Sequence, residues 1–309
     1  MTSTDAEPGT TTPPQPKQTV GPFGAPPLAL AAGLLTVFLW ASAFIGIRAA
    51  GEELSPGALT LARLTIGGLL LGVVVAIRRV SMPPRADLPR LFLVGLLWFG
   101  IYNIALNAAE QRIDAGTASM VIALGPVIIA VLAGLMLKEG FPRNLIVGGA
   151  IAFAGVLLIG VATSNQGLSA GIGSLLAFVA ACTYAGGVIT QKPLLARTSA
   201  LMVTWLACLV GAVLCLPFLP QLIDGLSDAS TRTILWTLYL GIFPTAVAFT
   251  TWGYALARST AGRMGALTYL SPPIAVALAW LILAETPPWL AIAGGALSLA
   301  GVIFSQRKK

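Results

Sequence analysis

The chain has 309 residues, of which 57% are hydrophobic and 9% are charged. A soluble domain carries about 25% charged residues, so this composition excludes an ordinary water-soluble fold. The net charge of +7 does not indicate nucleic-acid binding, because the basic residues lie in short loops between apolar runs. The chain has no histidine, and its three cysteines fall inside apolar runs, so neither a metal site nor a disulfide framework is predicted.

Residues 1–26 are rich in Pro, Thr and Gly and predict a disordered cytoplasmic tail. Uncharged runs follow, and most match the ~20 residues that a helix needs to cross the hydrocarbon core of a bilayer. We therefore predict an all-α integral membrane protein. The ten expected transmembrane helices cover residues 28–49, 57–77, 88–109, 115–137, 144–162, 169–190, 199–220, 233–256, 262–283 and 288–306.

The distribution of basic residues predicts the orientation in the membrane. If the N-terminus is cytoplasmic, all but four of the 18 Lys and Arg residues lie on the cytoplasmic side. Lys and Arg are enriched in cytoplasmic loops, so both termini are predicted to be cytoplasmic, in a bacterial inner membrane. The four basic residues on the outer side are Arg48, Arg63, Arg112 and Arg232.

An internal repeat divides the chain into two halves, 27–163 and 164–306. A shift of 146 residues brings Pro126 onto Pro272 and Glu139 onto Glu285 without a gap. For the first helices of each half, a shift of 144 brings Arg48 onto Lys192. Five helices is an odd number, so the second half is predicted to be inverted relative to the first. Inverted repeats are a recurrent transporter architecture, with the binding site between the halves near the bilayer midplane.

The segment LWASAFIGIRAA (39–50) is similar to the first helix of EamA-type members of the drug/metabolite transporter superfamily. Residues 59–72 resemble the second helix of that family. Residues 105–139 and 253–285 resemble its signature, in which a small-residue turn is followed by a mid-helix Pro and, after an apolar run, a Glu. The resemblance covers residues 28–306 and implies transport of a small organic solute, for which the inverted repeat predicts alternating access.

Pro126 and Pro272 are predicted to kink two helices, because proline removes one N–H and clashes with the carbonyl four residues earlier. The carbonyls of Ile122 and Thr268 would then need partners, which favours positions beside a cavity over a mere packing kink. On the third helix, Asn103 and Asn107 share a face that leads to Glu110. The amides either bond neighbouring helices or line a polar cavity.

Arg63 is close enough to its helix end to reach the interface, and snorkelling is the preferred interpretation over a vestibule that attracts a carboxylate. Tyr and Trp residues deep in the spans predict an aromatic wall suited to an amphiphilic solute. The candidate substrate-binding residues are Trp40, Arg63, Tyr102, Asn103, Asn107, Ser119, Tyr184, Trp205, Trp252 and Tyr269, with Thr268 and Ser271 as further hydroxyl candidates.

No acidic residue falls in the middle of a predicted span, so the hypothesis is facilitated or exchange transport without a proton relay. We expect a carrier for amino acids that acts as an exporter, is a monomer or homodimer, and needs no metal or cofactor. A nucleotide-sugar or drug carrier of the same superfamily is the alternative. A channel or a membrane-embedded lipid enzyme ranks lower, because no acids converge and no histidine is present.

Overall fold

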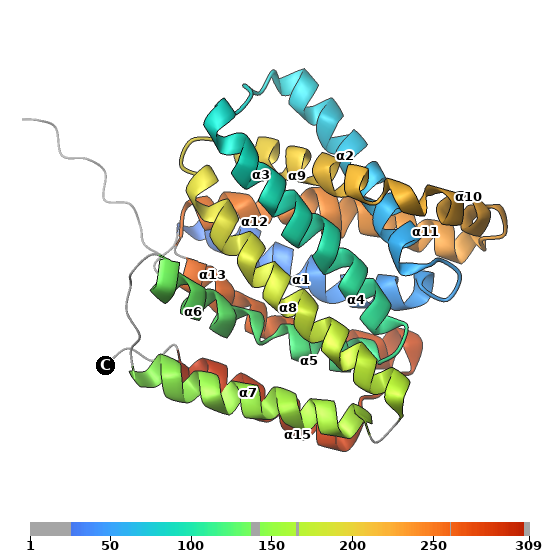
Figure 1. Ribbon diagram of the computed structural model, residues 1–309, viewed down its shortest axis with the longest axis vertical. Helices are drawn as coiled ribbons and strands as arrows, with labels where there is room; N and C mark the ends of the chain where they lie inside the picture. The colour runs from blue at the N-terminus through green and yellow to red at the C-terminus, as the bar shows by residue number, and fades with distance from the viewer. Residues whose placement is uncertain (1–25, 137–142, 165–166, 260, 306–309) are drawn as a thin grey trace, which may run out of the picture.

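The computed structural model describes residues 26–136, 143–164, 167–259 and 261–305, and every regular element in those ranges is helical. The helices pack into one bundle (Figure 1). This confirms the predicted all-α class. The predicted tail lies outside the described residues, apart from Pro26, and Glu139 also lies outside them.

The first half of the chain is made of helices joined by short turns. In order, they are α1 (Pro27–Ala50), α2 (Pro56–Arg78), the 3₁₀ turn η2 (Arg85–Asp87), α3 (Leu88–Val94), the π-helical segment η3 (Gly95–Ile101), α4 (Tyr102–Glu110), α5 (Ala115–Ile122), α6 (Gly125–Met136) and α7 (Arg143–Ser164).

The second half is again a succession of long and broken helices. Its elements are α8 (Leu168–Leu194), α9 (Ala200–Leu214), the 3₁₀ turn η4 (Leu216–Phe218), α10 (Leu219–Ser227), α11 (Thr231–Leu240), the π-helical η5 (Gly241–Val247), α12 (Ala248–Ala257), α13 (Ala261–Leu267), the 3₁₀ turn η6 (Thr268–Leu270), α14 (Ser271–Leu278), the π-helical η7 (Ala279–Leu283) and α15 (Trp289–Ser305).

Six helical segments in the described residues are long and apolar enough to cross a membrane, and the bent pair α9–α10 makes a seventh. Fewer helices than the ten predicted spans therefore meet this criterion of length and hydropathy. Three further apolar helices, Ile146–Ile159, Thr268–Leu283 and Trp289–Gly301, are shorter. The prediction of one straight helix over 199–220 is wrong, because the chain bends by 53° between α9 and α10. Pro217 and Pro220 lie just after this bend, and neither can donate a helix hydrogen bond.

Serine caps begin α2 and α9 in the same way. The Ser55 hydroxyl accepts a hydrogen bond from the Ala58 N–H, and the Ser199 hydroxyl accepts one from the Met202 N–H. Such caps satisfy a backbone donor that the first turn leaves free. The shift that brings Arg48 onto Lys192 also brings Ser55 onto Ser199, so the first helices of the two halves keep the predicted spacing.

The backbone of the middle helices repeats with the shift that brings Pro126 onto Pro272. The π-helical segment Gly95–Ile101 coincides under this shift with the π-helical segment Gly241–Val247. A π-helical turn is rare and frees backbone carbonyls. In the first half the amide of Asn103 donates to the carbonyls of Trp98 and Phe99, and in the second half the hydroxyl of Thr245 donates to the carbonyl of Leu240.

Each of these π-helical segments packs through its first glycine against a helix of the other half. A Cβ at Gly95 would lie 2.5 Å from Cβ of Val210 on α9, and one at Gly241 would lie 2.6 Å from Cβ of Ile66 on α2. Ile66 and Val210 are themselves counterparts in the repeat, with the same spacing as Arg48 and Lys192. The two halves therefore contact each other reciprocally, as the partners in a two-fold symmetric interface do.

The helices that end the two halves, α7 and α15, lie side by side along one edge of the bundle (Figure 1). Their backbones meet at glycines: a Cβ at Gly155 would lie 2.5 Å from the carbonyl oxygen of Gly294, and one at Gly294 would lie 2.7 Å from that of Gly155. Small residues of this kind let membrane helices approach closely.

Candidate functional site

The central feature is a cavity of ≈ 30 Å³ between the two halves, with room for about two water molecules. Helices from both halves line it, and its polar and aromatic lining includes Trp40, Tyr102, Ser119, Tyr184, Thr268 and Ser271. Four of these were predicted as principal site residues and two as further hydroxyl candidates. Binding of a solute by them stays a prediction.

The two helix breaks next to the prolines meet at this cavity. Helix α5 ends at Ile122, four residues before Pro126, and α13 gives way to a 3₁₀ turn at Thr268, four residues before Pro272. Ile122 and Thr268 both line the cavity, as do their neighbours Ala123 and Ser271. The hydroxyls of Ser119 and Thr268 donate to backbone carbonyls one turn earlier. The broken backbone of both halves thus contributes to the lining of one cavity.

Aromatic rings form the rest of the wall. The Trp40 ring centroid lies 5.9 Å from that of Trp98, 6.4 Å from that of Tyr184 and 5.3 Å from that of Phe249. The Trp40 indole N–H donates to the carbonyl of Pro244 in η5, at 3.3 Å. Trp40 therefore joins the first helix of one half to the π-helical segment of the other. Sequence reasoning missed Trp98, although its position in an uncharged span was visible.

A second, smaller cavity of ≈ 10 Å³ adjoins the first and includes Arg63, Trp40, Tyr102 and Phe249 in its lining. The Arg63 side chain is 3% exposed, and its Nε donates to Oγ1 of Thr245 at 3.1 Å. The snorkelling interpretation of Arg63 is therefore wrong. The reason is tertiary packing, because η5 of the other half covers this side of α2. The guanidinium lies inside the bundle, beside the aromatic wall.

The two asparagines of α4 are buried and bond to neighbouring backbone and side chains. Asn103 holds the π-helical carbonyls of η3, and the amide of Asn107 donates to Oγ1 of Thr60 at 2.9 Å and to the carbonyl of Pro56. These contacts match the helix-bonding interpretation of the two amides. Both side-chain carbonyl oxygens are buried without a hydrogen-bond partner among the described residues.

The remaining predicted site residues lie behind or beside the cavities. Trp252 is fully buried and contacts Trp40, at 5.0 Å between ring centroids, as a second layer. Trp205 is half-buried and packs over Gly72, where a Cβ would lie 2.9 Å from the indole nitrogen. Tyr269 is half-buried and packs against the core around α1 and α4. The described lining of the two cavities includes none of these three.

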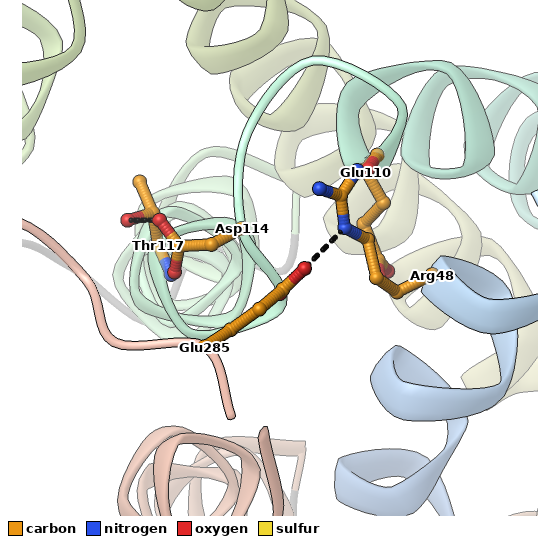
Figure 2. Close-up of polar contacts among 5 residues, drawn as sticks. All are labelled: Arg48, Glu110, Asp114, Thr117 and Glu285. Atoms are coloured by element: carbon orange, nitrogen blue, oxygen red, sulfur yellow. Dashed lines mark hydrogen bonds and ion pairs between the residues drawn. The ribbon is translucent and has the colours of Figure 1, made fainter. Parts of the chain in front are cut away.

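A third cavity of ≈ 330 Å³ opens at the C-terminal ends of α1 and α4, and we call it the Arg48 vestibule. It is lined by Arg48, Gln111, Arg112, Asp114 and Glu285, among others. Nε of Arg48 lies 2.7 Å from Oε1 of Glu285, as Figure 2 shows. Its Nη1 donates to the carbonyl oxygen of Glu110, also at 2.7 Å.

Asp114 begins α5 at the rim of the vestibule. One carboxylate oxygen accepts from the Thr117 N–H at 2.8 Å, and the other accepts from the Thr117 hydroxyl at 2.7 Å. Burial raises the pKa of Asp114 above its ordinary value, although both hydrogen bonds act in the opposite direction. No group of three or more Cys, Asp and Glu side chains that could hold a metal ion occurs within the described ranges.

Comparison with known proteins gives concordant matches along nearly the whole chain. The EamA-like transporter family matches twice, over residues 27–161 and 171–306. A probable terminal-alkyne amino-acid exporter of Streptantibioticus cattleyicolor is 38% identical over 275 residues, which cover 89% of this chain and 92% of the relative. A probable amino-acid metabolite efflux pump of Salmonella typhimurium is 28% identical over 284 residues, 88% of this chain and 92% of the relative.

A solved crystal structure has a similar fold, with a TM-score of 0.63 and 20% sequence identity. The alignment covers 90% of this chain and 97% of the solved chain.

Proposed function

This chain belongs to the EamA-like transporter family of the drug/metabolite transporter superfamily and is a multi-pass membrane transporter, and from that premise we propose that it exports amino acids. The proposed architecture has ten spans in two inverted five-helix halves, 27–163 and 164–306, in a bacterial inner membrane with both termini cytoplasmic. The recurrence of the π-helical segments at equivalent positions of the repeat supports the two-half arrangement.

The observation that carries the proposal is the cavity at which the helix breaks of both halves meet. Its volume of ≈ 30 Å³ is far below the ~300–1,000 Å³ of ligand pockets, so this conformation has the central site closed. Rocking of one half against the other would enlarge the cavity toward one side of the membrane at a time. Closed access fits a carrier better than a channel, whose pore must stay open while it conducts.

The lining chemistry suits an amino acid with an apolar side chain. Arg63 offers a guanidinium for the carboxylate, and backbone carbonyls beside Pro126 and Pro272 offer acceptors for the ammonium. Trp40 and Tyr184 offer ring faces for the side chain. A nucleotide sugar carries two negative charges, and Arg63 is the single cation in the described lining of the two central cavities, so this alternative is less well supported.

Counterflow in proteoliposomes tests the proposal. Radiolabelled amino acids and nucleosides are offered singly to vesicles loaded with the same unlabelled compound. We expect saturable uptake of at least one apolar amino acid. Arg63→Gln is expected to reduce this uptake by about tenfold or more, the loss of one charged hydrogen bond. The control is Arg232→Gln, at an exposed position on α11, which should leave uptake unchanged. Uptake of nucleosides alone, or equal uptake by the Arg63 variant, would contradict the proposal.

A further inference from the structure

Glu110 is the last residue of α4, at the end of the predicted face of Asn103 and Asn107, and its side chain is only 1% exposed. Both carboxylate oxygens are buried, and neither has a hydrogen-bond partner among the described residues. An ionised carboxylate in such a place is strongly disfavoured, because burial removes its hydration without replacing it. In this conformation, the surroundings of Glu110 therefore favour a neutral carboxyl over a carboxylate.

The inverted half shows that this carboxyl is not needed to build the helix end. Arg48 donates to the backbone carbonyl of Glu110, and its counterpart Lys192 donates to the backbone carbonyl of Leu256 at 2.5 Å. The shift that brings Pro126 onto Pro272 also brings Glu110 onto Leu256, which is fully buried as well. Leucine thus performs the structural task in one half. The carboxyl of Glu110 in the other half is therefore not required for this contact.

The surroundings of Glu110 hold two cations and two other acids. Arg48 lies on α1, Arg63 on α2, Asp114 in the turn after α4, and Glu285 at the end of η7. Figure 2 shows the Arg48 guanidinium next to Glu110, with its ion pair directed to Glu285. The Arg48 guanidinium thus contacts the backbone carbonyl of Glu110 and the carboxylate of Glu285, and in this conformation its ion pair is with Glu285.

We propose that Glu110 is a proton-binding site that sets whether the Arg48 vestibule is open or closed. While Glu110 holds its proton, Arg48 stays paired with Glu285, and this pair ties α1 to the end of η7. When Glu110 releases the proton to water in the vestibule, its carboxylate competes for Arg48 and weakens the tie. One proton leaves per carboxylate formed, and no other group changes charge. This inference rests on the proposed transport function and replaces the expectation of transport without a proton site.

Thiol accessibility tests the inference without any transported solute. The reporter is Ala43→Cys, a buried position on α1 that lines the cavity beside Arg63. Cys182, Cys208 and Cys215 are replaced by Ala in the same background, because they would otherwise react. A membrane-impermeant maleimide is added to right-side-out vesicles over a pH series from about 5 to about 9. Each rate is corrected for the intrinsic pH dependence of the maleimide reaction with an exposed reporter outside the vestibule, Ser227→Cys at the end of α10, in the same background.

The corrected labelling rate of the wild-type reporter should rise with pH, by at most about tenfold per pH unit, the limit for release of one proton. Glu110→Gln and Glu110→Leu should give low rates that no longer depend on pH. Glu285→Gln is the matched control and should give a higher rate at every pH, since Arg48 loses its partner while Glu110 still titrates. An unchanged pH dependence in Glu110→Gln would overturn the proposal.

Two further measurements distinguish a proton site at Glu110 from a metal-cation site and from a carboxylate that stays ionised. Sodium replaced by choline at constant pH should leave the labelling rate unchanged, and a rate that follows sodium would mean that Glu110 binds a metal cation and not a proton. The infrared carbonyl band of a protonated carboxyl should be present in the wild type and reduced in Glu110→Gln. This band does not depend on transport. Its absence would refute the proton site even if amino-acid export were established. Its presence would support the proton site even if export were disproved.

Discussion

Arg48 at the end of α1 and Glu285 after η7 form an ion pair of 2.7 Å between the first and the last quarter of the chain. The same guanidinium also donates to the carbonyl of Glu110. Three helix ends are thereby joined at the vestibule. Because the two side chains are 32% and 23% exposed, solvent screens the pair, and its importance is expected in conformational control more than in stability.

A double-mutant cycle with Arg48→Gln and Glu285→Gln measures the strength of this pair. We expect a coupling free energy of about 0.2–1 kcal/mol, the usual range for partly exposed pairs, and a smaller value at high salt. Thermal or denaturant unfolding in detergent provides the free energies. A coupling above about 3 kcal/mol that is insensitive to salt would mean that the pair is buried in the folded protein.

The reciprocal glycine contacts predict that both halves tolerate extra volume equally poorly. Gly95→Ala and Gly241→Ala each place a methyl group 2.5–2.6 Å from a Cβ of the facing helix. We expect each to lower the free energy of unfolding by about 1–3 kcal/mol, as overpacking does. The matched control is Gly68→Ala, whose Cβ would meet Cys208 at 3.7 Å, an ordinary contact, and which gains helix propensity. Equal stability of all three variants would contradict the contact between the halves.

Trp40 is expected to matter more than any lipid-facing tryptophan. Its ring touches four aromatic neighbours, so Trp40→Ala should lower the free energy of unfolding by about 3–5 kcal/mol, and Trp40→Phe by much less. Trp280→Ala is the control, because this tryptophan is 61% exposed on the outer surface of the bundle. In counterflow, Trp40→Phe should raise KM for an apolar amino acid more than it lowers kcat. A change in neither constant would remove Trp40 from the proposed site.

The sequence predicts the helical class, the spacing of the internal repeat and the two proline breaks, because glycine, proline and glutamate keep their positions where apolar residues vary. It does not predict the π-helical segments. Their wide turns depend on partners such as Asn103 and Thr245, and an asparagine or threonine inside a helix has several other uses.

The depth of charged side chains is the other property that sequence reasoning missed. Arg63 and Glu110 both lie near helix ends, which by position alone favours exposure. Arg63 is covered by the other half of the chain, through Thr245 on η5, whereas Glu110 is buried among the helix ends around Arg48. The sequence shows how far a charged residue lies from the end of its own helix. It does not show whether another helix covers that residue, because this depends on the tertiary structure.

Asp114 gives a pH prediction outside the spans. Burial raises its pKa in the folded state, so the folded protein binds this proton more readily than the unfolded chain does. Its contribution to stability is therefore fully present below the unfolded pKa near 4 and is lost as pH rises through the folded pKa. We expect the stability of the wild type relative to Asp114→Asn to fall as the pH rises above about 4. Measurement of both melting temperatures over this range tests the sign, and a rise would contradict it.

Asp114→Ala separates charge from helix capping at the same position. The carboxylate accepts from the Thr117 N–H, a bond that asparagine can keep and alanine cannot. Alanine should therefore cost about 0.5–2 kcal/mol relative to asparagine at every pH. Equal melting temperatures of the two variants would show that the cap adds nothing.

Arg48 and Lys192 are counterparts in the internal repeat, so their substitutions are predicted to have opposite effects on which end of the bundle is open. Each cation bonds a helix-end carbonyl, Arg48 that of Glu110 and Lys192 that of Leu256, and Lys192 also bonds the carbonyl of Ser259 at 2.7 Å. In an inverted repeat these two contacts lie at opposite ends of the bundle. Loss of one of these contacts should favour opening of the bundle at the end where the contact lies. Because alternating access opens one end at a time, the opposite end should then be closed more often.

The Ala43→Cys reporter distinguishes the two ends. Arg48→Ala should raise its rate of labelling from outside, and Lys192→Ala should lower it. Arg258→Ala is the control for Lys192→Ala, because its side chain is exposed, stacks on the Tyr254 ring and donates to the Tyr254 carbonyl one turn earlier. Labelling that rises in both the Arg48 and Lys192 variants would mean that both contacts stabilise the same closed end. That result would exclude the inverted arrangement of the two halves on which alternating access depends.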